Sequence, residues 1–202
     1  MSEARPVGGV TEVFLARHGE TEWNTVRRGQ GQLDSPLTPE GIAGLQRMAP
    51  RLLGCSIDGV FSSPLGRAQT SAQLYADALG CAVVIVDELA EIHHGAMAGL
   101  QAEEIERDFP GEMATRAADK YRWRFPDGES YADGAVRAAH ALRVIGESGA
   151  GRPLIISHEM IGRMLLGQLL DLTPEEALRC GHPHGVVYRV DVASKRLDEI
   201  RG

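Results

Sequence analysis

The chain has little cysteine, no long apolar run and no excess of positive charge. Cys55, Cys81 and Cys180 are an odd number of cysteines that lie far apart, so they predict neither a disulfide framework nor a structural zinc site. No apolar run approaches the roughly 18 residues of a membrane-spanning helix, and residues 1–9 lack the apolar core of a signal peptide. We therefore expect a cytoplasmic protein without a membrane partner.

The charge balance argues against nucleic acid as a partner. The 21 Lys and Arg residues are outnumbered by 28 Asp and Glu residues, which gives a net charge of −7. Nucleic acids and anionic membranes both attract basic surfaces. Lys120, Arg122 and Arg124 form one basic cluster, with Tyr121 and Trp123 between them, but three cations make too small a footprint for nucleic acid. This cluster is equally consistent with a solvated face and with contact to a second acidic group on a small substrate.

The composition is that of an ordinary globular protein. The 202 residues are 43% hydrophobic and 24% charged, which fits one domain over residues 1–202 with residues 1–9 flexible. The sequence contains no repeat and no low-complexity tract, and it does not indicate an oligomeric state.

Strand and helix signals alternate along the chain. Thr38 and Pro39 are typical of the N-cap and first residue of a helix, and Gly80 is typical of a helix end. Such alternation predicts one three-layer αβα domain with a mainly parallel sheet, an α/β fold. The expected strands cover residues 10–16, 57–61, 82–86, 153–156 and 185–192, and further helical segments cover residues 101–109 and 130–147.

Residues with catalytic or anion-binding side chains follow four of these strands. Ligands of parallel sheets bind outside the carboxyl ends of the strands, so residues at these ends are expected to meet at one edge. The residues concerned are Arg17-His18, Ser62-Ser63-Pro64 with Arg67, Glu91, and Ser157-His158.

The first of these groups suits a phosphate ester. Arg17 offers a planar fork of donors that can hold a phosphoryl group at two points. His18, with an ordinary pKa of about 6.5, can use one ring nitrogen as a nucleophile while the other is held as a donor. Gly19 lets the backbone approach a ligand closely.

On these residues the chain resembles the histidine phosphatase superfamily, the phosphoglycerate mutase-like proteins. The matching motifs run in the family's order from about residue 12 to residue 160. They are Leu15-Ala16-Arg17-His18-Gly19-Glu20-Thr21-Glu22-Trp23-Asn24, Gln30-Gly31, Asp34-Ser35-Pro36-Leu37-Thr38, Ser62-Ser63-Pro64-Leu65-Gly66-Arg67-Ala68-Gln69-Thr70, Leu89-Ala90-Glu91 with Gly95, Gly128-Glu129-Ser130, and Ser157-His158.

The resemblance implies a role for each matched position. His18 would become a phosphohistidine, Arg17, Arg67 and a protonated His158 would surround the phosphoryl oxygens, and Asn24 would add a hydrogen bond. Such charge neutralisation suits the loose transition state of phosphoryl transfer and needs no metal or other cofactor.

The resemblance also implies an acid and an acceptor. Glu91 would protonate the leaving oxygen and later act as a base towards water. Residues 92–128 would be a substrate-side insertion. Because only 36 residues separate Glu91 from Gly128, fewer than in the family's mutases, we expect an open pocket and water as the acceptor. The expected function is hydrolysis of a small phosphorylated metabolite, and the alternatives are a phosphoglycerate mutase and a phospho-ligand sensor.

Two positions depart from the family's pattern. Met97-Ala98-Gly99 stands where the family often has Trp-Glu-Gly, so substrate preference is expected to differ. Glu159 follows His158, where glycine is common. Pointing inward, it would repel an anionic substrate; we expect it to point outward into the first turn of the next helix, where it favours the helix dipole.

The remaining histidines do not predict a metal site. His93-His94 and the pair His182 and His184 lack an acidic partner set, so we expect the second pair at the pocket rim or in a turn. His140 shares a helix face with Val136 and Val144 and is expected to be structural. Glycines 29 and 31 lack the third glycine and preceding strand of a dinucleotide loop.

Overall fold

A computed structural model describes residues 9–202, so all of the segment expected to be flexible except Gly9 lies outside the described residues. The chain forms a six-stranded sheet in the order β3-β2-β4-β1-β5-β6. The first four strands in this order are parallel to one another, and β5 and β6 are antiparallel additions at one edge. The strands are β1 (Glu12–Arg17), β2 (Gly59–Ser62), β3 (Val83–Ile85), β4 (Pro153–Ser157), β5 (Val186–Asp191) and β6 (Arg196–Arg201).

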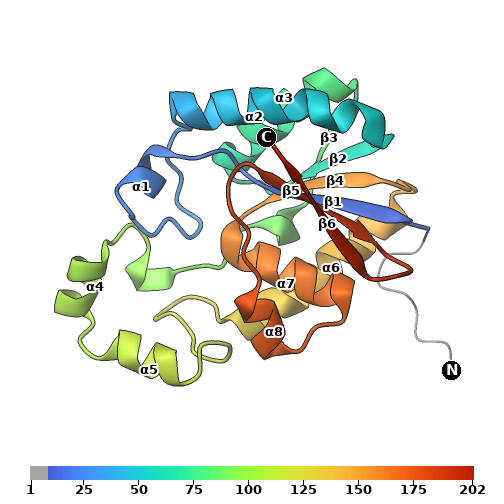
Figure 1. The fold of residues 1–202 in the computed structure, drawn as a ribbon. Coiled ribbons are helices and arrows are strands. Elements are labelled where there is room, and N and C mark those ends of the chain that lie inside the picture. The colour runs from blue at the N-terminus through green and yellow to red at the C-terminus, as the bar shows by residue number, and fades with distance from the viewer. Residues whose placement is uncertain (1–8) are drawn as a thin grey trace, which may run out of the picture.

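Helices cover both faces of the sheet (Figure 1), which confirms the predicted three-layer α/β class. On one face lie α2 (Pro39–Leu52) and α3 (Gly66–Leu79), and on the other lie α6 (Tyr131–Glu147) and α7 (Glu159–Leu170). Between residues 9 and 202 no helix combines the length and apolar character that crossing a bilayer requires. The shorter helices are α1 (Glu22–Thr25), α4 (Ala102–Asp108), α5 (Glu112–Ala118) and α8 (Pro174–Arg179), with 3₁₀ turns at Leu53–Cys55, Asp87–Leu89 and Gly95–Met97.

The apolar residues of the strands divide into two cores. Phe14 and Ile156 point to the α2–α3 side, whereas Leu15 and Ile155 point to the α6–α7 side, as the period of two along a strand requires. The sheet is therefore buried on both faces, and its strand ends are where polar chemistry can reach solvent.

Local sequence signals set the ends of the long helices. Thr38 caps α2 by accepting a hydrogen bond from the Gly41 N–H, and Pro39 is its first residue. Gly80 ends α3 with φ of 70°, a left-handed conformation that glycine adopts without steric cost. These predictions are confirmed. The sequence analysis missed β6, however, because its residues are largely exposed and charged and carry no apolar pattern.

Strand register determines which loops meet. Arg17 lies opposite Ser157 in the β1–β4 pair, and Ser62 lies opposite Ile156 in the β2–β4 pair. The residues that follow β1, β2 and β4 therefore leave the sheet at the same edge, with β4 in the middle.

Candidate active site

The register of β1 against β4 places the rings of His18 and His158 side by side. Their ring centroids are 5.1 Å apart with an interplanar angle of 55°. Both residues are buried, with 2% and 0% of their surfaces exposed. The two imidazoles come from residues 140 positions apart in the chain, so their meeting depends on the parallel sheet.

Hydrogen bonds fix the protonation state of His18. Its Nδ1 lies 2.7 Å from the carbonyl oxygen of Gly19, which can only accept, so Nδ1 carries the hydrogen and Nε2 keeps its lone pair. The Arg67 Nε–H donates to this Nε2 across 3.2 Å. Burial lowers the pKa of His18 well below its ordinary value, and the charges of Arg67 and Arg17 lower it further. His18 is thus a neutral imidazole whose unprotonated Nε2 accepts a hydrogen bond from a cation.

Arg67 is held by the loop that follows α1. Its Nη1 donates to the Leu33 carbonyl (2.6 Å) and to Asp34 Oδ1 (2.9 Å), and its Nη2 donates to the Gly31 carbonyl (2.7 Å). The side chain is buried, and burial lowers its pKa although Asp34 opposes this shift. The guanidinium is therefore a rigidly placed charge beside His18.

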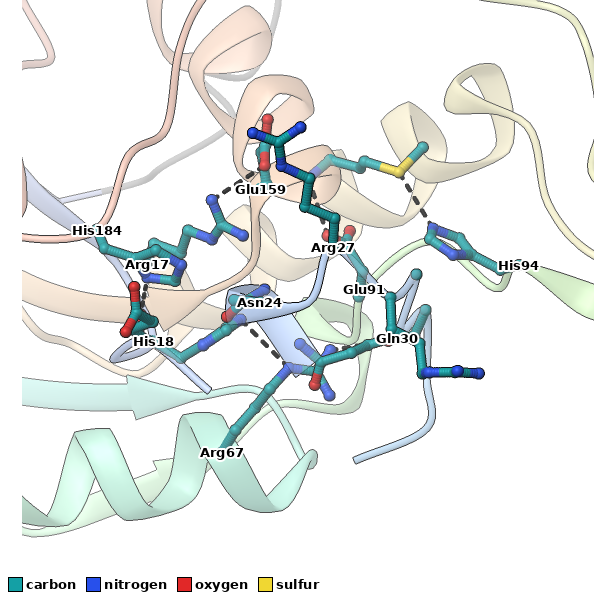
Figure 2. A pocket seen from close by; sticks show the side chains of 15 residues that line it. Arg17, His18, Asn24, Arg27, Gln30, Arg67, Glu91, His94, Glu159 and His184 are labelled. Carbon is teal, nitrogen blue, oxygen red and sulfur yellow. Dashed lines mark hydrogen bonds and ion pairs between the residues drawn. The ribbon is translucent and has the colours of Figure 1, made fainter. Parts of the chain in front are cut away.

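Arg17 forms an ion pair that the sequence analysis did not expect. Its Nη1 lies 2.9 Å from Oε2 of Glu159, and the pair lies at the pocket (Figure 2). Burial lowers the pKa of Arg17, and Glu159 acts in the opposite direction. The expectation that Glu159 points outward is wrong, because its carboxylate pairs with Arg17 and lines the pocket; Arg163 holds its other oxygen.

Asn24 serves the turn and the pocket together. Its Oδ1 accepts hydrogen bonds from the Thr21 N–H (3.0 Å) and the Thr21 hydroxyl (2.9 Å), which completes a capping box at α1. Asn24 also lines the pocket. Its amide nitrogen is thus available as a donor while its oxygen orders the turn.

Glu91 lies at the N-terminus of α7. Its Oε1 accepts from the Ile92 N–H (2.8 Å) and the Ile161 N–H (2.9 Å), and its Oε2 accepts from the Met160 N–H (2.9 Å). The carboxylate is buried to 7% exposure but lines the pocket. These three donors fix its position relative to His158, which directly precedes α7.

Arg137 of α6 holds the loop that carries Glu91. Its guanidinium donates to the carbonyls of Glu88 (2.7 Å), Ala90 (2.8 Å) and Glu91 (3.2 Å) and pairs with Glu129 at 2.8 Å. Glu129 of the Gly128-Glu129-Ser130 motif thus helps to hold this loop through Arg137. The sequence analysis missed Arg137, because nothing in an arginine on an amphipathic helix reveals that its partners are backbone carbonyls.

His158 lies beneath His18 rather than in the pocket wall. Its Nε2 is 2.7 Å from the Ser63 hydroxyl, and its Nδ1 is buried without a hydrogen-bond partner among the described residues. Burial lowers the pKa of His158 well below its ordinary value, and Arg67 lowers it further. Burial beside cations disfavours a further positive charge in the free protein, and protonation of His158 around a bound phosphoryl group stays a prediction.

The pocket above His18 has a volume of about 440 Å³. It contains five of the six predicted site residues, all except His158, and Figure 2 shows them arranged around the cavity. Its full lining is Arg17, His18, Glu20, Asn24, Arg27, Arg28, Gly29, Gln30, Gly31, Arg67, Glu91, His94, Glu159, Met160 and His184.

Of the two histidines expected at the pocket rim or in a turn, His184 lines the pocket and His182 does not. His184 packs edge-on against His18 with ring centroids 5.3 Å apart and places its Nδ1 2.7 Å from the His18 carbonyl oxygen. His182 is buried and stacked on Tyr188, so the expectation of a rim or turn position is wrong for it. Burial lowers the pKa of His182 and of His184 to about 4 in each case. His140 pairs with Glu88 at 2.7 Å on a half-exposed helix face.

Two further features lie outside the pocket. Met97 is 1% exposed and belongs to the core, so its effect on substrates is indirect. Arg122 and Arg124 pair with Asp119 and Asp133. Within residues 9–202, no group of three or more His, Cys, Asp or Glu side chains is placed to hold a metal ion.

Comparison with known proteins identifies the family of the chain. The model of the histidine phosphatase superfamily (branch 1) matches residues 13–200. A protein of Yersinia enterocolitica named "Probable phosphoglycerate mutase GpmB" is 39% identical over 184 residues, which cover 89% of this chain and 84% of that protein.

Solved structures share the fold. Mycobacterial glucosyl-3-phosphoglycerate phosphatase in complex with VO₃ is 26% identical, with a TM-score of 0.80 and coverage of 95% of this chain and 98% of that one. The alpha-ribazole phosphatase of Shigella flexneri is similar in fold, with a TM-score of 0.84 at 24% identity and coverage of 94% and 95%.

Proposed function

Because the chain is an enzyme that belongs to the histidine phosphatase superfamily (branch 1), we propose that it hydrolyses phosphate monoesters of small metabolites through a phosphohistidine at His18. One observation carries the proposal. The unprotonated Nε2 of His18 faces the guanidinium of Arg67 at 3.2 Å, with His158 packed against its ring. A nucleophilic nitrogen beside a fixed cation is what attack on a phosphoryl group requires.

The reaction proceeds as two displacements on phosphorus. In the first, the Arg67 Nε–H passes its hydrogen bond from His18 to a phosphoryl oxygen, which frees Nε2 to bond to phosphorus. The bond to the ester oxygen breaks, and Glu91, which enters this step in its carboxylic acid form, gives its proton to the departing alcohol. In the second, Glu91 takes a proton from water, the water oxygen bonds to phosphorus, and the nitrogen–phosphorus bond breaks to release inorganic phosphate. Arg17 and Arg67 neutralise the charge on the phosphoryl oxygens in both steps.

A buried nitrogen supports a bound anion at this position. Arg17 lines the pocket, and its Nε has no hydrogen-bond partner among the described residues. Buried polar atoms are nearly always paired and a guanidinium N–H can only donate, so it favours a ligand that supplies an acceptor. A phosphoryl dianion would also raise the pKa of His158, because an opposite charge favours the protonated ring. Asn24 adds a donor from the turn at α1.

We propose that residues 1–202 form one domain, in which residues 92–128 are an insertion on the substrate side of the pocket. His94 of this segment lines the pocket and stacks on Phe125 with ring centroids 4.3 Å apart. Water is the proposed acceptor because this connection is short. The comparisons include proteins named as phosphatases and as phosphoglycerate mutases, so mutase activity is the second candidate.

A panel of phosphate esters incubated with the purified protein in the presence of a chelator tests the proposal. We expect free phosphate, whereas a positional isomer without release would indicate a mutase, and saturable binding without turnover would indicate a sensor. We also expect His18→Ala to abolish both phosphate release and covalent labelling by a ³²P-labelled ester. His140→Ala is the matched control, since it removes an imidazole that lies on a half-exposed helix face. Full activity in the His18 variant would exclude the covalent scheme.

A further inference from the structure

Glu159 is the first residue of α7, and its side chain lies in the wall of the pocket (Figure 2). Its two carboxylate oxygens are divided between two arginines. Oε2 lies 2.9 Å from Nη1 of Arg17, and Oε1 lies 2.6 Å from Nη2 of Arg163, one helical turn further along α7. The Glu159 side chain is 39% exposed, whereas the two arginine side chains are 14% and 15% exposed.

This carboxylate shares a cation with the proposed substrate. A phosphoryl oxygen that accepts a hydrogen bond from Arg17 would lie within a few ångströms of Glu159, because both would contact the same guanidinium. Like charges at such distances repel strongly in a partly buried site, where water screens them less than at the surface. Part of the attraction of Arg17 for phosphate is therefore cancelled before any ligand arrives.

We propose that Glu159 determines how tightly the pocket holds a phosphoryl group, by competing with it for Arg17 and repelling its oxygens. The inference rests on the proposed phosphate site and adds a residue to it. Its effect acts on substrate, transition state and inorganic phosphate alike, since all three carry the same anionic oxygens. Such uniform effects change KM and product inhibition and leave kcat unaltered.

Arg163 moderates the effect of Glu159. Its guanidinium neutralises part of the carboxylate charge and also donates to the Tyr131 hydroxyl at 3.3 Å, which fixes it in place. Without Arg163, the carboxylate would interact with Arg17 alone, and its repulsion of phosphate would be stronger. The two residues are therefore expected to be coupled in phosphate binding.

A purely structural role for Glu159 makes a different prediction. An acidic side chain in the first turn stabilises a helix through the helix dipole. If this were its whole function, neutralising Glu159 would lower the free energy of unfolding and leave phosphate affinity unchanged. Measuring both quantities separates the two roles.

The direct test is binding of inorganic phosphate to Glu159→Gln, measured by isothermal titration calorimetry. We expect the dissociation constant to fall by about three- to tenfold, with KM for p-nitrophenyl phosphate lowered in parallel and kcat retained. Glu175→Gln is the matched control, because it removes the same charge from the exposed first turn of α8. Unchanged or weaker phosphate binding in Glu159→Gln overturns the inference, as does the absence of saturable phosphate binding to both proteins.

A double-mutant cycle tests the coupling. Arg163→Met is expected to weaken phosphate binding about threefold in the parent protein and to have little effect in the Glu159→Gln background. Arg163→Gln, which also removes the charge but retains a hydrogen-bond donor, replaces it if thermal melting shows that Arg163→Met is unfolded. Equal effects in the two backgrounds contradict the coupling. Because calorimetry requires no turnover, a protein that binds phosphate but hydrolyses no ester would refute the proposed function and leave the Glu159 result intact.

Discussion

Arg67 Nε and His18 Nε2 are 3.2 Å apart, so the nitrogen proposed to attack phosphorus already accepts a hydrogen bond from a guanidinium. The same contact serves two purposes. Burial lowers the pKa of His18 most, and the charge of Arg67 lowers it further, which keeps the ring unprotonated; Arg67 also places a positive charge where phosphoryl oxygens would lie. Arg67 thus keeps the nucleophile unprotonated and attracts the electrophile, and its hydrogen bond has to pass from Nε2 to a phosphoryl oxygen before Nε2 can attack phosphorus.

Replacing Arg67 by Lys is expected to retain the charge and lose this geometry. A lysine ammonium cannot reach His18, Asp34 and the two loop carbonyls together, because its donors radiate from a single atom. We expect kcat/KM for p-nitrophenyl phosphate to fall about 100-fold and the free energy of unfolding to fall by about 2 kcal/mol. Arg47→Lys, at an exposed pair with Glu40, is the control and should match the parent. A tenfold or smaller loss of kcat/KM would mean that charge alone suffices.

Protein stability is expected to depend on pH between 6.5 and 4. Burial lowers the pKa of His182 to about 4, while a histidine in the unfolded chain has a pKa of about 6.5. In this window the unfolded chain binds protons that the folded chain excludes, so the free energy of unfolding is greatest above pH 6.5 and falls as the pH drops. Each such histidine removes about 1 kcal/mol at pH 5.5.

Urea unfolding at pH 7.5 and pH 5.5 measures this dependence. Burial also lowers the pKa values of His18 and His158. The urea midpoint is therefore expected to fall between pH 7.5 and pH 5.5 by more than the contribution of His182 alone. His182→Gln should reduce the pH dependence by the contribution of one group. Equal midpoints at the two pH values would show that the buried imidazoles accept protons without loss of the fold.

The position of the site could be predicted from sequence because it follows from topology. Parallel strands end at one edge, so residues such as Arg17, Arg67 and His158 at three strand ends had to approach one another. The two helix caps were also predictable, because Thr38 and Gly80 act through local backbone geometry.

Tertiary interactions determined what the sequence did not reveal. The direction of Glu159 depends on two arginines, one from β1 and one from the next turn of α7, and their combined attraction outweighs the preference for solvent. Strand β6 forms through backbone pairing with β5, for which its exposed charged side chains give no apolar signal. Burial and the charge of Arg67 lower the pKa of His158, an effect that depends on tertiary neighbours the sequence did not reveal.

Glu91→Gln is expected to slow the reaction according to the leaving group. An alcohol leaves poorly without a proton, whereas p-nitrophenolate leaves readily, so the loss should be about 100-fold for glycerol 2-phosphate and less than about tenfold for p-nitrophenyl phosphate. Both esters should be compared by kcat/KM, because kcat also contains the second displacement, in which Glu91 acts as the base on the same intermediate for both esters. Equal losses would indicate that Gln perturbs the three N–H contacts of the carboxylate at α7 rather than removing an acid.

His184 is expected to position His18 through its backbone. The His18 carbonyl oxygen accepts from Nδ1 of His184 at 2.7 Å, so this nitrogen must carry the hydrogen. An asparagine side chain can place an amide N–H near the same point, whereas alanine offers no donor. We therefore expect His184→Asn to keep kcat within about threefold of the parent and His184→Ala to lower it about tenfold, because a small displacement of a nucleophile slows its attack.

The KM for p-nitrophenyl phosphate separates this role from phosphate binding. If His184 acts on the orientation of His18, KM should change little in either variant. The kcat should then be retained in His184→Asn, which keeps a hydrogen-bond donor, and fall in His184→Ala, which has none. If it contacts the phosphoryl group from its place in the pocket wall, both variants should raise KM together. Equal kcat values for the Asn and Ala variants would contradict a positioning role, because only the asparagine can restore the hydrogen bond to the His18 carbonyl.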